Sequence, residues 1–426
     1  MKMKKVCIIG LGYVGLPLAC LAAEKGYTVT GVDVDSKKVE SINKGISPLE
    51  DEELKEKVKR LKGKITATTE GVSAVKDSDI SIICVPTPID KNYMPDLSCV
   101  KSAAETIAKG LKKGHLVVLE STVAPGTTET DVKGILEKSG LKAGKDFLLA
   151  FCPERIDPGN KRFRVSNIPR VLGGINEESA KKAAEFYKSI LDAEVLTLSS
   201  VKAAEAVKIM ENSFRDVNIA FVNEMAKSFD KFGIDVTEVI KGASTKPFSF
   251  MAHYPGCGVG GHCIAVDPYY MIEDAKRRGF DHKLLKIARE INNSMPEYTI
   301  GKVIDGLKEL GMGIKGVKVT VLGLAYKGNV DDMRESPAVD IIERLKALGA
   351  DVKVFDPHVL GRSDVKSLDD ALKSEVVVIA TDHNEFKKLD LGLLKKNGVR
   401  LIVDGRNLID KAKAEGLGLV YRGIGR

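Results

Sequence analysis

Residues 5–15, KVCIIGLGYVG, decide the fold of the amino-terminal part of the chain. The apolar run that ends at Ile9 is typical of a buried strand, and three glycines in GxGxxG spacing follow it. In this motif the first glycine makes a tight turn, the second lets a pyrophosphate approach the backbone, and the third lets the next helix pack on the strand. The residues of the predicted phosphate-binding loop are Gly10, Gly12, Tyr13, Val14 and Gly15.

Asp33 follows the predicted second strand, Thr28–Val32, and lies eighteen residues after Gly15. An acidic side chain at this place hydrogen-bonds the 2′-hydroxyl of a ribose and would repel a 2′-phosphate. The sequence therefore predicts NAD, rather than NADP, as cofactor. The alternative is a glycine turn with a structural role alone.

Strands alternate with helices in the first half of the chain, which favours a mostly parallel sheet with helices on both faces. The change to long helical periodicity comes at Ser199. Predicted strands are Val6–Ile9, Thr28–Val32, Ile80–Val85, Leu116–Glu120, 147–152 and 168–173, and predicted helices are Val14–Lys25 and Glu178–Leu191.

Ala203–Phe232 has apolar residues at helical spacing, and no Pro or Gly interrupts it before Gly233. At 1.5 Å per residue such a helix spans about 45 Å, which suits a connector between domains. Because one connector seldom buries two apolar faces alone, residues near 200–232 predict a homodimer interface. More helix is expected from Pro268 to about Leu310.

The third part of the chain repeats the first. Its glycine loop is degenerate, because Ala325 replaces the middle glycine and Lys327 precedes the last one. Such a loop suits a nucleotide-containing substrate better than a second dinucleotide, the alternative being a decayed copy that serves as scaffold. The matched pairs are Lys5–Gly15 with Lys318–Gly328, Val29–Asp33 with Val352–Asp356, and Ser78–Val85 with Ser374–Thr381.

We therefore expect an α/β protein in which two doubly wound, Rossmann-like domains are joined by a helical middle domain. The expected domains are 1–198 for the dinucleotide, 199–312 for the long helix, the loop with Cys263 and the dimer contact, and 313–426 for the substrate nucleotide.

Residues 258–264, GVGGHCI, place Cys263 directly after a glycine-rich turn. A thiolate attacks carbonyl carbon well, and closely approaching backbone can offer N–H groups to an oxygen beside it. Cys263 is thus a candidate nucleophile, and the alternative is a structural cysteine in a tight turn. Asp267, four positions on, is either a base or an acid that caps a helix.

Lys208 and Asn212 share one face of the predicted long helix and together could stabilise an oxyanion. Glu154 and Thr122 follow predicted strands, at the edge where open α/β sheets bind ligands. Each of these residues could equally be an ordinary surface or loop residue.

Composition excludes several other classes of protein. The 426 residues are 43% hydrophobic and 29% charged, with a net charge of +7 and no basic stripe interleaved with aromatics, so nucleic-acid binding is not expected. No apolar run is long enough to cross a membrane, and no leader is evident, so we expect a cytoplasmic protein. Seven scattered cysteines without a CxxC pair argue against a disulfide framework, and no metal is expected.

Six blocks in this order resemble the nucleotide-sugar 6-dehydrogenase family over essentially the whole chain. The family includes UDP-glucose, GDP-mannose and UDP-N-acetylhexosamine dehydrogenases. The blocks are GLGYVG at 10–15, ESTVAPGTT at 120–128, Pro153-Glu154, EAVKIMENSFRDVNIAFVNE at 205–224, GVGGHCIAVDP at 258–268 and MRESPA at 333–338.

The resemblance implies an NAD-dependent, four-electron oxidation of a sugar C6 alcohol to a carboxylate. Cys263 matches the family nucleophile that carries the thiohemiacetal and the thioester, and Lys208 matches the lysine that steadies the oxyanion. Asp267 matches the carboxylate that works with a water as base, and Glu154 matches a glutamate implicated in acid–base chemistry. The family pattern also places Thr122 at the catalytic site. Residues expected near the cofactor are Thr87, Thr122 and Arg334. Residues expected near the substrate are Glu154, Lys208, Asn212, Arg215, Gly260 and Lys327.

Two differences from the UDP-glucose enzymes indicate a particular branch of the family. Pro158 stands where UDP-glucose enzymes carry a second glutamate, which leaves the group that assists hydrolysis open, and Val266 stands where they carry a lysine. Both resemble the N-acetylhexosamine branch, with UDP-N-acetylmannosamine narrowly favoured over UDP-N-acetylglucosamine and UDP-glucose as alternatives. The product would feed surface polysaccharide or glycan synthesis. A two-electron hydroxy-acid dehydrogenase and a non-catalytic NAD-sensing scaffold are the alternatives from other classes.

Overall fold

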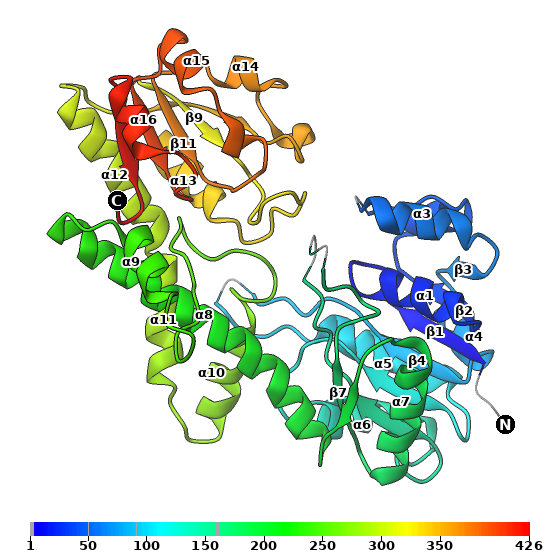
Figure 1. Cartoon of the computed structure of the whole chain (residues 1–426). Coiled ribbons are helices and arrows are strands. Elements are labelled where there is room, and N and C mark those ends of the chain that lie inside the picture. Colours follow the sequence, from blue (N-terminus) through cyan, green and yellow to red (C-terminus); the bar gives the residue numbers. More distant parts are fainter. Residues whose placement is uncertain (1–3, 50, 91, 158–159, 161) are drawn as a thin grey trace. The chain divides into compact units, whose positions relative to one another are not determined.

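The computed structural model describes residues 4–49, 51–90, 92–157, 160 and 162–426 (Figure 1). These residues form two compact units. The amino-terminal unit holds Met1–Glu211 and Tyr269–Gly279, and the carboxy-terminal unit holds Asn212–Pro268 and Phe280–Arg426.

The amino-terminal unit is built on an eight-stranded sheet of order β3-β2-β1-β4-β5-β6-β7-β8. All neighbours are parallel except β6 and β7, which are antiparallel. The strands are β1 (Lys5–Ile9), β2 (Thr28–Val32), β3 (Ile65–Thr68), β4 (Ile80–Ile83), β5 (Leu116–Leu119), β6 (Leu148–Phe151), β7 (Arg170–Gly174) and β8 (Val195–Thr197).

Alternation along β1 shows why helices cover both faces of this sheet. Val6 and Ile8 belong to one apolar cluster, and Cys7 and Ile9 belong to another, because successive side chains of a strand point to opposite faces. Helices α1 and α7 supply residues to the first cluster, and α4 and α5 supply residues to the second. The α-helices of this part are α1 (Gly15–Glu24), α2 (Ser36–Asn43), α3 (Glu52–Arg60), α4 (Gly71–Lys76), α5 (Ser98–Gly110), α6 (Lys133–Leu136) and α7 (Glu177–Ile190). A short π-helix, η1 (Thr128–Val132), and a short 3-10 helix, η2 (Glu137–Ser139), flank α6.

The predicted long helix is present as α8, Val201–Phe232, and begins in the amino-terminal unit and ends in the carboxy-terminal unit. The helical region expected from Pro268 to about Leu310 is present and consists of three helices. Gly279, with a φ of +87°, follows the first of them and permits a backbone turn that other residues rarely adopt. The remaining helices of this region are α9 (Val236–Ala243), α10 (Asp267–Arg277), α11 (Lys283–Asn293) and α12 (Met295–Glu309).

The carboxy-terminal unit contains a second sheet, of five parallel strands in the order β10-β9-β11-β12-β13. Helices α12 and α13 pack on one of its faces, and apolar residues of α14, α15 and α16 pack on the other. The strands are β9 (Lys318–Leu322), β10 (Asp351–Phe355), β11 (Val376–Ile379), β12 (Leu401–Asp404) and β13 (Val420–Gly423), and the helices are α13 (Pro337–Ala347), α14 (Leu368–Ala371), α15 (Leu391–Lys396) and α16 (Lys411–Gly416), with turns η3 (Leu360–Arg362) and η4 (Phe386–Lys388).

Two doubly wound sheets and a long helical middle region confirm the predicted fold class. The sequence repeat is incomplete in structure, because the helix after the second glycine loop begins only at Pro337. The division into three domains at residues 198 and 312 stays a prediction.

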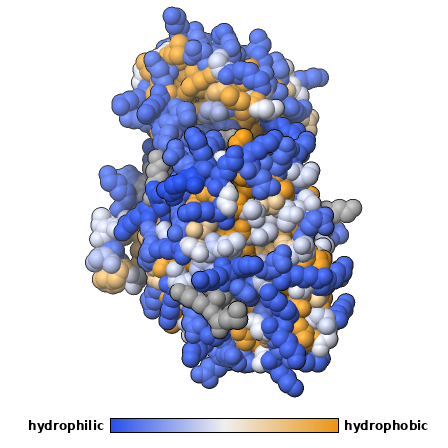
Figure 2. All heavy atoms as spheres, turned by 90° about the vertical axis from the view of Figure 1, so that its right-hand side faces the viewer, coloured by the Kyte–Doolittle hydropathy of each residue, from blue (hydrophilic) through white to orange (hydrophobic). Residues whose placement is uncertain are grey.

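Side chains on the surface are mainly hydrophilic on the face that Figure 2 shows, with apolar residues in separate patches between them. Over the part of the chain that the structure describes, no helix is both long and apolar enough to cross a membrane.

Candidate active site

The first glycine loop, after β1, has the geometry that its sequence predicts. Gly10 has a φ of +97°, and a Cβ there would lie 2.6 Å from the carbonyl oxygen of Cys84, so no other residue fits. A Cβ on Gly15 would lie 1.9 Å from the carbonyl oxygen of Gly10. At Gly12, by contrast, the described residues place no such contact within 4 Å of a Cβ. The space in front of Gly12 is where a pyrophosphate could approach the start of α1.

Asp33 lies directly beside this loop. Its Oδ2 accepts a hydrogen bond of 2.9 Å from the backbone N–H of Leu11, and its Oδ1 accepts one of 3.0 Å from Asp35. The Nζ atom of Lys38 lies 3.9 Å from the carboxylate. The side chain of Asp33 is 9% exposed, so the loop orients the carboxylate and leaves a small part of it at the surface.

The other predicted residues of this unit lie at the same edge of the sheet. Thr87 is buried after β4, Thr122 is half-buried after β5, and Glu154 is buried after β6. Because β2, β1, β4, β5 and β6 are adjacent and parallel, their carboxyl ends meet at one edge. The first glycine loop and Asp33 lie at this edge too, where α/β sheets bind ligands.

Glu154 is held on both of its carboxylate oxygens. Its Oε2 accepts a 2.7 Å hydrogen bond from Arg170, and its Oε1 accepts hydrogen bonds from the backbone N–H groups of Arg155, at 2.6 Å, and Ile156. Arg170 is itself buried and lies 3.6 Å from Glu120, whose pKa burial raises above its usual range. Glu154 therefore fixes the turn after β6 as well as lying at the predicted site.

Lys208 is buried on α8, as expected for a site lysine rather than a solvated one. One turn earlier, the buried Glu205 accepts hydrogen bonds from the backbone N–H groups of Gly126, at 2.5 Å, and Thr128, at 2.9 Å. Burial raises the pKa of Glu205 to about 7. Glu205 thereby fixes this end of α8 to the loop that carries Thr122.

The glycine-rich segment before Cys263 lies in the carboxy-terminal unit and is anchored at several points. The N–H of Gly256 donates to Asn223 of α8 at 3.0 Å, and the N–H of Gly261 donates to the carbonyl of Arg334 at 3.0 Å. The Sγ of Cys257 is buried and donates to two carbonyls beyond β11 and β12. The side chain of Cys263 is exposed within the turn that follows.

Asp267 begins α10 and is buried directly after the Cys263 turn. Its backbone N–H donates to the carbonyl of Cys263 at 2.8 Å. Its carboxylate accepts a 2.5 Å hydrogen bond from the Nδ2 of Asn212, which is also buried. The structure thus brings together Asn212 and Asp267, which are 55 positions apart in sequence.

Gly260 and Gly261 pack against Tyr326, within the second glycine loop. A Cβ on Gly260 would lie 2.7 Å from the Cβ of Tyr326, and one on Gly261 would lie 2.7 Å from the ring of that tyrosine. Only glycine permits this approach, and the substrate contact at Gly260 stays a prediction. Lys327 is half-buried beside Tyr326.

Arg334 and Arg215 are both exposed. The guanidinium of Arg334 pairs with both carboxylate oxygens of Asp332 and interacts electrostatically with Cys263. Burial, followed by the charge of Arg334, lowers the pKa of His262. The imidazole of His262 is therefore neutral at pH 7, which fits a packed side chain rather than a proton carrier.

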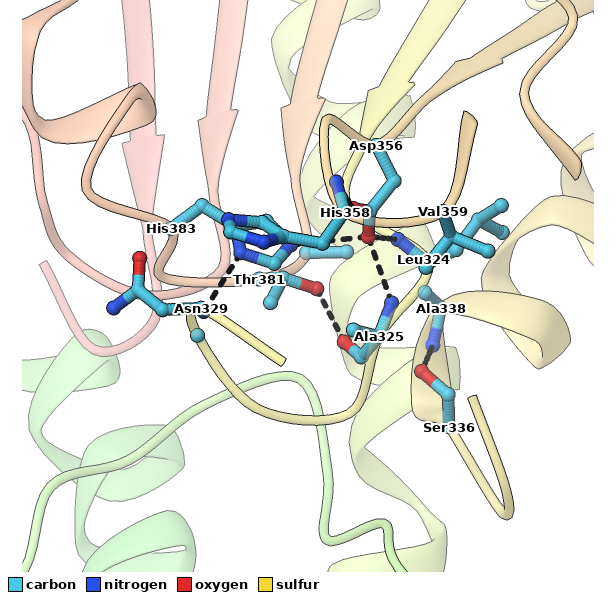
Figure 3. A network of polar contacts seen from close by, with 12 residues as sticks. Leu324, Ala325, Asn329, Ser336, Ala338, Asp356, His358, Val359, Thr381 and His383 are labelled. Atoms are coloured by element: carbon cyan, nitrogen blue, oxygen red, sulfur yellow. Dashed lines mark hydrogen bonds and ion pairs between the residues drawn. The ribbon is translucent and has the colours of Figure 1, made fainter. Parts of the chain in front are cut away.

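The second glycine loop differs from the first at its aspartate (Figure 3). Asp356 is fully buried, and its Oδ2 accepts hydrogen bonds from the N–H groups of Leu324 and Ala325 and from the Nε2 of His383. Its Oδ1 accepts from the N–H of His358. This carboxylate is occupied by the protein itself and does not reach solvent.

His358, His383 and Glu385 place one potential ligand atom each within 4.8 Å of one another. However, the Nδ1 of His383 accepts from the backbone N–H of Asn329 at 2.9 Å, and its Nε2 lies 3.0 Å from Asp356. With both ring nitrogens engaged, His383 has no lone pair to offer a metal without breaking this network.

The predicted site residues therefore divide between the two units. The second glutamate position, Pro158, lies outside the described residues. Gly10, Gly12, Tyr13, Val14, Gly15, Asp33, Thr87, Thr122, Glu154 and Lys208 lie in the amino-terminal unit, and Asn212, Arg215, Gly260, Cys263, Asp267, Lys327 and Arg334 lie in the carboxy-terminal unit.

Sequence reasoning identified Asn212 on α8 but missed the other members of the buried polar face of this helix. Its members are Glu205, Asn212, Asp216 and Asn223, and each hydrogen-bonds another segment. Their spacing of seven, four and seven positions is helical and was a usable signal. Arg170 gave no such signal, because its partners are distant in sequence.

Comparison with known proteins gives matches over nearly the entire chain. Domains of the UDP-glucose/GDP-mannose dehydrogenase family match in order: the NAD binding domain at residues 4–191, the central domain at 202–294 and the UDP binding domain at 320–411.

Among relatives, the UDP-N-acetyl-D-mannosamine dehydrogenase of Pyrococcus horikoshii is 39% identical over 425 residues, which covers 99% of both chains. The UDP-N-acetyl-D-glucosamine 6-dehydrogenase of Pseudomonas aeruginosa is 41% identical over 346 residues, which covers 80% of both chains.

Among solved structures, that of the UDP-D-ManNAc dehydrogenase from Pyrococcus horikoshii matches with a TM-score of 0.93 and 38% identity, and covers 99% of both chains. The domain matches, the relatives and the fold agree, and the chain belongs to the UDP-glucose/GDP-mannose dehydrogenase family.

Proposed function

We propose that this protein is an NAD-dependent UDP-sugar 6-dehydrogenase that oxidises a C6 alcohol to a carboxylate through a thioester on Cys263. The observation that carries the proposal is the Cys263 turn. Its thiol is exposed, its glycines are packed against Tyr326, and the carboxylate of Asp267 is held at its end by Asn212.

The residues of the first glycine loop fit NAD. Gly12 leaves room for a pyrophosphate, the start of α1 offers backbone N–H groups, and Asp33 is oriented toward the loop with solvent access for a ribose hydroxyl. When bound, NAD supplies the acceptor for the hydride that each of two oxidation steps releases.

Cys263 accounts for a reaction that continues past the aldehyde. Its thiolate would add to the aldehyde carbon and form a C–S bond, and the carbonyl oxygen would take up a proton from water to become the hydroxyl of a thiohemiacetal. Oxidation of that carbon leaves a thioester, and water then breaks the C–S bond to release the carboxylate and the thiol. The two oxidation steps remove four electrons from the sugar.

Three buried polar residues, Lys208, Asn212 and Asp267, would serve the same steps. Lys208 carries a positive charge that can stabilise an oxyanion, and the amide of Asn212 can hold a sugar oxygen. Asp267 would act with a water as base, since its carboxylate is the buried acid nearest in sequence to Cys263. For Glu154, the hydrogen bonds on both oxygens favour a role in shaping the turn after β6 over direct proton transfer.

We infer a UDP-N-acetylhexosamine as the substrate, with UDP-N-acetylmannosamine as the first choice. Support comes from the match to the UDP binding domain and from the names of the relatives, which include both mannosamine and glucosamine enzymes. Lys327 and Gly260 lie in the unit that contains this domain and would contact the substrate.

The deciding experiment counts NADH formed per UDP-N-acetylmannosamine consumed, with limiting sugar and excess NAD. A ratio of two establishes the four-electron oxidation and the sugar. A ratio of one means that the reaction stops at the aldehyde, so that the role given to Cys263 is wrong. If no NADH forms, UDP-N-acetylglucosamine and then UDP-glucose replace the sugar in the same assay.

Replacement of Cys263 by Ser separates the chemistry from binding. We expect Cys263→Ser to form no carboxylate at a measurable rate and to bind NADH as the wild type does. Cys257→Ser is the matched control for a second thiol in the same segment, and its carboxylate formation should persist. Normal acid production by Cys263→Ser would exclude the thioester.

We also infer a homodimer through α8. Met210, Phe214, Phe221 and Phe232 are all exposed and, at 3.6 residues per turn, lie on one face of this helix, opposite its buried polar face. Light scattering should give twice the 46.1 kDa mass of the chain, and Phe214→Glu with Phe221→Glu should give the monomer. A wild-type mass of 46.1 kDa at working concentration would contradict this inference.

A further inference from the structure

A buried chain of hydrogen bonds, which the chemistry proposed above does not use, fixes the start of the Cys263 segment. The N–H of Gly256 donates to the Oδ1 of Asn223 at 3.0 Å, and the Nδ2 of Asn223 donates to the Oδ1 of Asn292 at 2.9 Å. The Nδ2 of Asn292 then donates to the carboxylate and the carbonyl of Asp216, at 2.8 and 3.0 Å. Asn223, Asn292 and Asp216 are at most 1% exposed.

The direction of this chain is fixed. A backbone N–H can only donate, so the oxygen of Asn223 must face Gly256, and its nitrogen must face Asn292. The nitrogen of Asn292 then faces Asp216, which also accepts a 2.6 Å hydrogen bond from Arg289. Turning either amide over would set two donors or two acceptors against each other, so the chain specifies one arrangement.

The same helix also holds the other end of the segment. Asn223 and Asn212 lie on one face of α8, eleven positions apart, and Asn212 donates to Asp267. Cys263 lies between the two anchored residues, Gly256 and Asp267. The backbone that these two anchors hold therefore sets where the exposed side chain of Cys263 begins.

We propose that Asn223, with Asn292 behind it, is a positioning residue that sets the place of the Cys263 thiol. The proposal rests on the proposed role of Cys263 as nucleophile. Asn223 touches neither substrate nor cofactor in this role and acts through Gly256. A displaced nucleophile slows the chemical steps and leaves the binding of both ligands unchanged.

Two variants of the full-length protein test this role. Asn223→Asp keeps an acceptor for the N–H of Gly256 but sets a carboxylate oxygen against the Oδ1 of Asn292. Asn223→Ala removes the hydrogen bonds to both Gly256 and Asn292. We expect kcat with UDP-N-acetylmannosamine to fall about ten- to a hundredfold, with nearly unchanged KM for sugar and NAD. Asn223→Ala should lose at least as much as Asn223→Asp.

Thr299→Val is the matched control for stability. Thr299 is buried on α12 of the same unit and donates to the carbonyl of Met295 within its own helix, so its loss does not touch the Cys263 segment. This variant should lose thermal stability and keep kcat. All variants are compared at one temperature below the lowest melting point.

A second readout keeps the proposal separate from the proposed function. The rate at which iodoacetamide alkylates Cys263, measured by mass spectrometry of its peptide, reports on the thiol without any turnover. We expect a severalfold slower rate in Asn223→Asp and an unchanged rate in Thr299→Val. Unchanged kcat and alkylation in Asn223→Asp would overturn the positioning role.

If Cys263→Ser kept full activity, the proposed function would fail, and the alkylation rates would still decide whether Asn223 positions this thiol. If Asn223→Ala does not fold, Asn223→Asp decides. Asn292→Ala leaves the hydrogen bond between Gly256 and Asn223 in place. It should lower both kcat and the alkylation rate of Cys263, by a smaller factor than the Asn223 variants do.

Discussion

The two Rossmann-like sheets each end their second strand with an aspartate, and the two carboxylates have different surroundings. Asp33 accepts two backbone N–H groups and still reaches solvent. Asp356 accepts three backbone N–H groups and the imidazole of His383, and it is fully buried (Figure 3). The first is available to a ribose, and the second is part of the core.

The two glycine loops differ in the same sense. Residues 10–14 lead directly into α1, so the start of that helix faces the loop. Residues 323–336 form a much longer connection before α13, and they reach Gly260 and Gly261 through Tyr326, Arg334 and Glu335. A duplicated fold has thus kept its sheet while its second loop supports the Cys263 segment instead of a dinucleotide.

Removing the buried carboxylate should give the largest effect on stability. In the wild type, the N–H donors around this side chain meet carboxylate oxygens. In Asp356→Asn, some of these donors must face an NH₂ group instead, so we expect the free energy of unfolding to fall by about 3 kcal/mol. Urea unfolding followed by circular dichroism measures this, and NADH affinity should stay unchanged. A loss no larger than that of Asp33→Asn would break the contrast between the two aspartates.

The stability of the wild type and that of Asp356→Asn should depend differently on pH. Burial would raise the pKa of Asp356, but hydrogen bonds from His383, Ala325 and Leu324 outweigh it and hold the pKa at about 2, below the ordinary 3.8. A lowered pKa stabilises the fold above the ordinary value, and this contribution is lost as the pH falls from about 4 toward 2. The advantage of the wild type over Asp356→Asn should therefore shrink by about 1 kcal/mol between pH 7 and pH 3, and by more at lower pH. Urea titrations at pH 7 and pH 3 measure it, and a constant difference would contradict the assigned cause.

Asp33→Asn should affect binding more than stability. We expect NADH affinity to fall about tenfold, because a neutral amide replaces a charged acceptor for a ribose hydroxyl. Fluorescence titration of NADH gives this value, and NADPH should gain relative to NADH. If NADH affinity were unchanged, Asp33 would be as structural as Asp356.

The smallest effects should come from exchanging the middle residues of the two loops. Gly12→Ala should fold normally, since the described structure has no contact within 4 Å of the new Cβ, and should weaken NADH binding severalfold. Ala325→Gly should lower stability by about 1 kcal/mol through the entropy of the unfolded chain and should gain no dinucleotide binding. Calorimetry of both variants with and without NADH checks the pair. Binding of a second NADH by Ala325→Gly would show that the methyl group alone closes the second loop.

Local signals in the sequence predicted most of the fold. The glycine spacing and Asp33 indicated the first loop, and the uninterrupted run to Phe232 indicated α8. Even the late start of α13 had a local signal, since Ser336 caps the helix and Pro337 opens it. The sequence analysis treated the second loop as degenerate and did not predict the long connection between this loop and α13.

The candidate site was predicted in part. Residue types and resemblance identified Cys263, Asp267 and Asn212, and the structure joins the last two by a hydrogen bond. The burial and internal hydrogen bonding of the Asp356 carboxylate could not be predicted. They depend on His383, which is 27 positions later and folds onto the same loop. The hydrogen bond between Glu154 and Arg170 could not be predicted either, because Arg170 comes from the next strand.

The two faces of α8 also constrain how its sequence can change in length. An insertion or deletion of one residue between Asn212 and Asn223 would rotate everything beyond it by about 100°. Asn223 would then leave Gly256, and the line of exposed phenylalanines would turn toward a different side. Insertion of seven residues would nearly restore the angle but would shift the two anchors apart by about 10 Å. Homologous chains that keep both anchors should therefore align through this helix without gaps, however far their loops diverge.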